Sequence, residues 1–161
     1  MTESLDGPRW GPASGEAAKQ LVVLLHGLGA DGFDLIDLAP VWGEALPDAA
    51  FAAPHAPFPC DLAPYGRQWF SVQDRTPARI MAGVEAALPA LNAFLDAELA
   101  RLGLGAESMA LMGFSQGAMM TLACGLRRAS APAALLAFSG RIAFALPDDL
   151  AGAPPVLLVH G

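Results

Sequence analysis

The stretch SMALMGFSQGAMMTLACGLRR, residues 108 to 128, is the part of the sequence that decides the fold. Its apolar run over residues 108 to 114 predicts a buried strand, and residues 115 to 128 predict a helix that follows directly. Gly113 and Gly117 flank Ser115 in a G-x-S-x-G pattern, whose small residues allow a sharp turn between strand and helix. Such a turn presents a serine hydroxyl at the end of a sheet, so Ser115 is a candidate nucleophile. A helix N-cap is the alternative role for this side chain.

Further strands are predicted where short apolar runs end at turn residues, in KQLVVLLHG (19–27), AAFAAP (49–54), AALLAFSG (133–140) and PVLLVHG (155–161). Helical spacing of apolar residues predicts helices over 34–46 and from the Thr76-Pro77 start to Leu102. Strands that alternate with helices predict an α/β fold with a mostly parallel sheet covered on both faces. In such folds the working residues gather at the carboxyl ends of the strands, where HGLG, GFSQG, SGR and HG lie.

The chain is expected to form one domain over residues 19–161, preceded by a loose lead-in over residues 1–18. Residues 54–75 contain four prolines and no clear period, which predicts a long covering loop with a functional role. The composition gives a net charge of -7 without a basic stripe, so nucleic acid is not an expected partner.

No signal peptide and no apolar run of about 18 residues is seen in the sequence, which predicts a cytoplasmic protein without a membrane span. Cys60 and Cys124 have no metal-ligand spacing and are expected as free thiols. The sequence therefore predicts neither a metal nor a cofactor.

A serine that attacks a carbonyl generates an oxyanion, which needs hydrogen-bond donors already in place. The N–H of Gln116 is the first candidate donor, because the helix that begins here directs its free N–H groups toward the serine. The second donor is expected from the loop after another strand. Leu28 in HGLG is that candidate.

Five segments carry a resemblance to a known family: HGLGADG (26–32), APHAP (53–57), GRQWFS (66–71), GFSQGAMM (113–120) and VLLVHG (156–161). Together they resemble the phospholipase/carboxylesterase family of α/β-hydrolases, which includes the acyl-protein thioesterases, and PCDLAPYGRQWF (59–70) resembles the bacterial branch. The resemblance implies hydrolysis of a small-molecule ester or thioester through an acyl-enzyme on Ser115. It also implies an oxyanion hole at Leu28 and Gln116, and a loop over residues 54–75 that helps to shape the acyl site. Trp69 and Phe70 in that loop suggest an apolar group on the substrate, and packing of the loop is an equal alternative for them.

The general base for Ser115 is not evident in the sequence. In the family the acid and the histidine follow the nucleophile along the chain, and Asp148, Asp149 and His160 are the residues of those types after Ser115. A strand like PVLLVHG leads into the loop that carries the acid, and the histidine comes later still. We therefore expect a truncated α/β-hydrolase fold, lacking its last strand and helix and nearly inactive as given, with His160 left open as a substitute base.

The other two histidines are expected to be structural, since His26 matches the family's loop-shaping His-Gly and His55 lies in a turn. Two other functions stay open. Gly27, Gly29 and Gly32 form G-x-G-x-x-G, the dinucleotide-binding fingerprint, although the acid expected about 20 residues further on is missing from FAAPHAP (51–57). The second of these alternatives is a non-catalytic binding domain built on the hydrolase fold.

Overall fold

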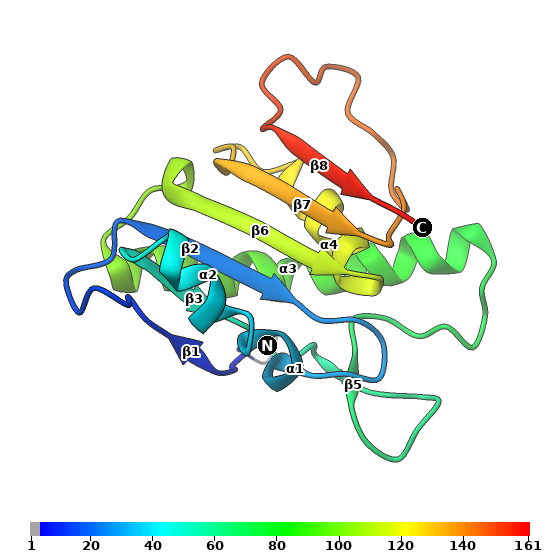
Figure 1. The fold of residues 1–161 in the computed structure, drawn as a ribbon. Helices are drawn as coiled ribbons and strands as arrows, with labels where there is room; N and C mark the ends of the chain where they lie inside the picture. The colour runs from blue at the N-terminus through cyan, green and yellow to red at the C-terminus, as the bar shows by residue number, and fades with distance from the viewer. Residues whose placement is uncertain (1–3) are drawn as a thin grey trace.

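The computed structural model describes residues 4–161, and its centre is a six-stranded sheet in the order β1-β3-β2-β6-β7-β8 (Figure 1). The strands are β1 (Arg9–Trp10), β2 (Gln20–Leu25), β3 (Ala49–Ala52), β6 (Met109–Phe114), β7 (Ala134–Phe138) and β8 (Val156–Val159). All neighbouring strands pair in parallel except β1, which runs antiparallel to β3. The predicted, mostly parallel sheet is therefore confirmed.

Helices cover both faces of the sheet. The strand residues that point to either face are apolar and need to be buried. On one face lie α1 (Gly32–Ile36) and α2 (Ala39–Ala45); on the other lie α3 (Pro77–Leu102) and α4 (Gln116–Gly125) (Figure 1). A short 3-10 helix, η1 (Ala106–Ser108), leads from α3 into β6. In β2, Leu21 and Val23 belong to the core under α3 and α4, whereas Val22 belongs to the core under α2.

The predicted helix over 34–46 is divided into α1 and α2. Pro40 lies in the first turn of α2, where its missing N–H would have no partner in any case. Proline at this point favours a new helix start over the continuation of α1. The apolar spacing alone does not record this effect, and it therefore predicted a single helix.

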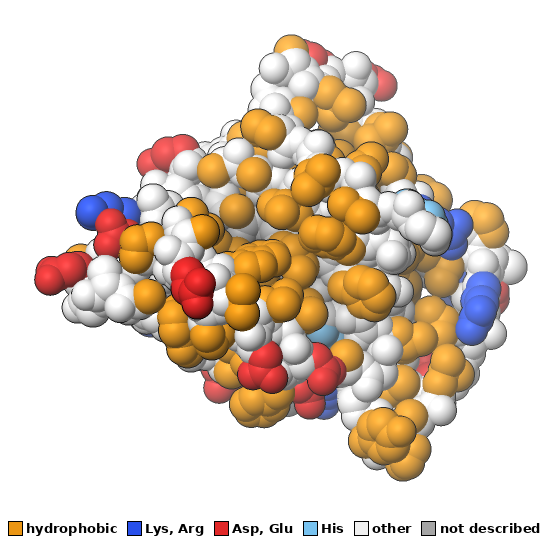
Figure 2. Space-filling view, in the orientation of Figure 1, with side chains coloured by type: hydrophobic (Ala, Val, Ile, Leu, Met, Phe, Trp, Pro, Cys, Tyr) orange, Lys and Arg blue, Asp and Glu red, His pale blue; other side chains and the backbone are white. Residues whose placement is uncertain are grey.

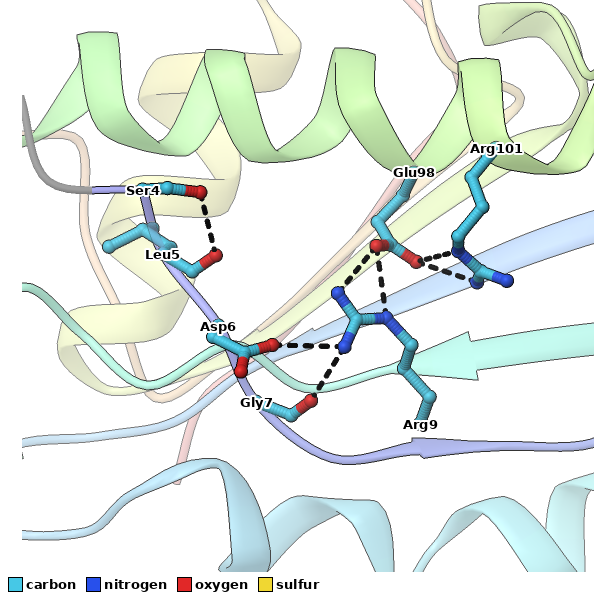
Figure 3. A network of polar contacts seen from close by, with 7 residues as sticks. All are labelled: Ser4, Leu5, Asp6, Gly7, Arg9, Glu98 and Arg101. Atoms are coloured by element: carbon cyan, nitrogen blue, oxygen red, sulfur yellow. Dashed lines mark hydrogen bonds and ion pairs between the residues drawn. The ribbon is translucent and has the colours of Figure 1, made fainter.

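Residues 4–18 differ from the loose lead-in expected from the sequence. Leu5 is buried in the core, and β1 adds a strand to the edge of the sheet. The guanidinium of Arg9 bonds the Glu98 carboxylate of α3, with Nη2 to Oε1 at 2.7 Å, and Arg101 bonds the other oxygen (Figure 3). Side-chain contacts to α3 and a two-residue strand hold this segment in place. Because neither requires an apolar run, no local sequence pattern predicted that it would be ordered.

Glu98 is buried, and this alone would raise the pKa of its carboxyl group. The hydrogen bonds from Arg9 and Arg101 outweigh burial, so the pKa of Glu98 lies below its usual value. The carboxylate therefore stays ionised and joins the N-terminal segment to the long helix.

Helix α3 is long and apolar enough to cross a membrane, judged by length and composition alone. Its apolar residues, among them Val84, Leu91 and Leu95, are buried in the core beneath the sheet. The same composition is typical of a core helix in a globular domain, and the packing of α3 is of that kind.

The β8 side of the sheet is more exposed than the β2 side. Within residues 4–161, β8 pairs with β7 alone, and all four residues of β8 are exposed. Figure 2 shows hydrophobic side chains spread over the face that α1 and α2 leave uncovered. Phe114 is 49% exposed, and Leu157 of β8, which pairs with Leu136 of the core under α2, is 51% exposed. The described residues thus leave an apolar surface at this side of the sheet.

Candidate active site

Ser115 lies at the carboxyl end of β6, in the turn that leads into α4. Its φ of 56° and ψ of -116° are unusual for a residue with a side chain. The backbone holds it there through two bonds, since its N–H donates to the Phe138 carbonyl at 2.9 Å and its carbonyl accepts from the Met119 N–H at 3.2 Å. This strained turn is the geometry that the G-x-S-x-G pattern predicts.

The two glycines of the pattern are needed because backbone passes very close to them. A Cβ on Gly113 would lie 2.1 Å from the carbonyl oxygen of Gly117. A Cβ on Gly117 would lie 1.8 Å from the carbonyl oxygen of Leu25, at the end of β2. The elbow is therefore packed directly against the neighbouring strand, with no room for a side chain between them.

The hydroxyl of Ser115 does not cap helix α4, so the alternative role as an N-cap is wrong for this turn. Ser115 instead lines a cleft of about 270 Å³. The other lining residues come from the loop after β2, from α1 and from the end of β6, and are His26, Gly27, Leu28, Ala30, Asp34, Leu35 and Phe114. The cleft is mainly apolar, and Asp34 is the acidic side chain among the described residues that line it.

Two backbone N–H groups beside this serine are free to bind an anion. Within the described part of the chain, the N–H groups of Leu28 and Gln116 donate to no protein acceptor. Leu28 lines the same cleft as Ser115, and Gln116 is the first residue of α4, where the helix dipole favours negative charge. The structure therefore brings the three predicted residues to one end of the sheet.

His26 is completely buried and both of its ring nitrogens are bonded. Because a carbonyl can only accept, Nδ1–H donates to the Gly27 carbonyl at 2.7 Å, and Nε2 then accepts from the Ala56 N–H at 2.9 Å. Burial lowers the pKa of His26 and keeps the ring neutral. Its contacts are those of a residue that shapes the loop, as the sequence predicts.

Trp69 and Phe70 do not line the cleft, so of the two roles that the sequence left open for them, substrate contact and packing of the loop, the structure shows packing. They are 0% and 2% exposed and belong to the core under α3 and α4. The long loop passes across the end of the sheet, and its small hairpin of β4 (Phe58–Pro59) and β5 (Arg67–Gln68) directs the next residues inward. Sequence reasoning cannot separate aromatic residues that contact substrate from those that anchor a loop.

No residue in the described range hydrogen-bonds the hydroxyl of Ser115. His160 is exposed beyond the end of β8, and strand β7 lies between β8 and β6 in the sheet. Asp148 and Asp149 lie in the segment between β7 and β8. The structure therefore does not bring these three residues into contact with Ser115.

The N-terminus of α1 is already occupied by protein groups. The Asp31 carboxylate accepts from the Phe33 N–H at 2.8 Å, and Asp34 accepts from the Asp31 N–H at 3.1 Å. The Gly32 N–H donates to Nδ1 of His55 at 3.1 Å, a contact that the sequence did not predict. A dinucleotide pyrophosphate needs these N–H groups, so the glycine spacing is explained by the turn itself.

A model of the phospholipase/carboxylesterase family matches residues 12–161. The chain belongs to the phospholipase/carboxylesterase family. Esterase YpfH of Escherichia coli strain K12 is a relative with 34% identity over 144 residues, which is 89% of this chain. Acyl-protein thioesterase 1 of Kluyveromyces lactis is 32% identical over 116 residues, or 67% of this chain.

The solved structure of esterase PE8 matches 99% of this chain with a TM-score of 0.89 and 46% identity, and this chain covers 75% of that one. The fold is therefore the α/β-hydrolase fold, as this family requires. The chain spans 61% of the length of esterase YpfH and 50% of the length of acyl-protein thioesterase 1.

Proposed function

We propose that the protein is a serine hydrolase that cleaves carboxylic esters or thioesters through an acyl-enzyme on Ser115. The observation that carries this proposal is the strained serine beside two free N–H groups at an apolar cleft. A strained backbone persists when the surrounding structure holds it, and such residues cluster at active sites. The relatives named esterase and thioesterase support the same chemistry.

In the first step, Oγ of Ser115 attacks the carbonyl carbon and the carbonyl oxygen becomes an oxyanion. The N–H groups of Leu28 and Gln116 bind this charge as it develops. The carbonyl then reforms, the bond to the leaving alcohol or thiol breaks, and the serine proton ends on that leaving group. Water next hydrolyses the acyl-enzyme, which releases the carboxylic acid and restores the serine.

The cleft indicates which part of a substrate fits beside the serine. Leu28, Leu35 and Phe114 present apolar surface there, and a volume of about 270 Å³ accommodates a short apolar group. We infer that the preferred ester carries such a group next to its carbonyl.

The described residues supply the nucleophile and the donors but place no base at Ser115. We infer that these residues alone turn over esters slowly, because in a serine protease the loss of a triad member leaves about 10³ to 10⁴-fold catalysis over water. His160 is the substitute base to test, since it is the histidine that follows Ser115.

The test measures covalent labelling by a fluorophosphonate together with hydrolysis of a short p-nitrophenyl ester. We expect labelling at Ser115, its loss in Ser115→Ala, and slow turnover that His160→Ala leaves unchanged. Turnover at ordinary enzyme rates that His160→Ala removes would show that His160 is the base. An unlabelled Ser115 would instead favour a non-catalytic binding domain, since such a domain has no use for an activated hydroxyl.

A further inference from the structure

Residues 66–70, which we name the brace, run alongside the loop that carries Leu28. The Gly29 N–H donates to the Arg67 carbonyl at 2.9 Å, and the Arg67 N–H donates to the Ala30 carbonyl at 2.8 Å. A Cβ on Gly66 would lie 2.1 Å from the Gly29 carbonyl oxygen, so the two backbones are in direct contact. The brace thus fixes the residues that follow Leu28.

The brace also fixes the residue two positions before Leu28. The indole N–H of Trp69 donates to the carbonyl of His26 at 2.9 Å, in a fully buried position. Arg67 further bonds the Ala56 carbonyl through Nε at 2.9 Å, and the Ala56 N–H in turn donates to the His26 ring. Leu28 is therefore bracketed on both sides by residues that the brace holds.

The other end of the brace is bonded to Gln116, the residue that supplies the second proposed donor. The Gln116 side chain is buried, and its Oε1 accepts from the Trp69 N–H at 3.0 Å. Its Nε2 donates to the Phe70 carbonyl at 2.9 Å. Both ends of the amide are thus bonded to the brace, and neither bond reaches the cleft.

We propose that the Gln116 side chain is a positioning residue which, through the brace, sets the spacing between the N–H groups of Leu28 and Gln116. This inference rests on the proposed function, because the two N–H groups act together only if they bind one oxyanion. Donors of this kind work when they are held within about 0.5 Å of the productive geometry. A side chain that links the two donor segments through buried hydrogen bonds provides that restraint.

The first variant is Gln116→Met, which keeps similar length and removes both hydrogen bonds to the brace. We expect its fluorophosphonate labelling rate and its kcat for a p-nitrophenyl ester to fall about 10- to 100-fold, with KM within about twofold of the wild type. KM should change little because the amide does not line the cleft. Cys124→Ala is the matched control, since Cys124 is buried in the same helix but lies away from the brace.

The second variant, Gln116→Glu, separates positioning from a loss of folding. Its carboxylate accepts from the Trp69 N–H as the amide does, but when ionised it repels the Phe70 carbonyl. When protonated it donates to that carbonyl, and burial favours the protonated form. The labelling rate of Gln116→Glu relative to wild type should therefore rise as the pH falls from about 8 to about 5.

The Cys124→Ala control should be less stable than wild type and yet react with the fluorophosphonate at the wild-type rate. Gln116→Met labelled as fast as Cys124→Ala would overturn the inference while leaving the proposed function intact. A pH-independent ratio for Gln116→Glu would overturn it as well. Absence of labelling in the wild-type protein would instead reject the proposed function, and the inference with it.

Discussion

Replacing Ser115 by glycine should leave the protein more stable than replacing it by alanine. Ser115 has a φ of 56° and a ψ of -116°, a combination that glycine adopts freely and that a Cβ disfavours. Alanine removes the hydroxyl but keeps the strain, whereas glycine removes both. No hydrogen bond from the hydroxyl to another described residue complicates the comparison.

The size of the effect follows from two opposing contributions. A backbone in such a sparsely populated region costs about 1 to 3 kcal/mol. Glycine loses more conformational entropy on folding, which costs about 0.5 to 1 kcal/mol relative to alanine. The free energy of unfolding of Ser115→Gly should therefore exceed that of Ser115→Ala by about 1 kcal/mol, or about 2 to 4 °C in Tm for a chain of this size.

Urea denaturation followed by circular dichroism measures both variants at one pH. Ser108 provides the matched control because it does not have a positive φ. There, Ser108→Gly should be less stable than Ser108→Ala by about 0.5 to 1 kcal/mol. If glycine were less stable than alanine at position 115 by a similar margin, the turn would store no strain and the reasoning would be refuted.

Two further predictions concern contacts that hold the elbow and the N-terminal segment. Gly117→Ala should lose about 3 kcal/mol or more of stability in urea denaturation, because the new Cβ would meet the Leu25 carbonyl oxygen at 1.8 Å and the two backbones must separate. An unchanged urea midpoint would contradict this close packing. Glu98→Gln should cost about 2 kcal/mol at pH 7, since Arg9 and Arg101 lose their charged acceptor. The pKa of Glu98 is lowered in the folded state, so its contribution is complete above the unfolded value of about 4.3 and lost as the pH falls through the folded value. The urea midpoints of wild type and Glu98→Gln should therefore approach each other as the pH falls from about 4.3 through the folded value, and a constant difference would contradict that linkage.

Long apolar runs made most of the fold predictable from sequence. An apolar run in the sequence marks each of the strands β2, β6, β7 and β8. Apolar residues at helical spacing mark helices α3 and α4. The two-residue strand β1 and the hairpin of β4 and β5 are too short to create a period. Their positions depend on contacts with distant residues, such as the bond between Arg9 and Glu98, which no local pattern records.

The candidate site, like the fold, was predictable from sequence only in part. Ser115, Leu28 and Gln116 could be chosen from sequence because the turn requires small residues at fixed spacing and leaves free N–H groups beside the serine. Trp69 was open to two roles from sequence, because an aromatic residue in a long loop suits either substrate contact or packing. Its burial results from three segments meeting at the end of the sheet, and this meeting is a property of the folded chain.

At this end of the sheet, main-chain atoms make the closest contacts, between Gly66 and Gly29 and between Gly117 and Leu25. Main-chain atoms in direct contact, together with the buried Gln116 side chain, hold the amides in place, and these contacts lie outside the cleft. Leu35 and Phe114, by contrast, contribute side chains to the cleft wall. If Ser115 acts as we propose, we expect substitutions at those two positions to change substrate preference, by natural drift or in a directed library, while the amides and the serine keep their places.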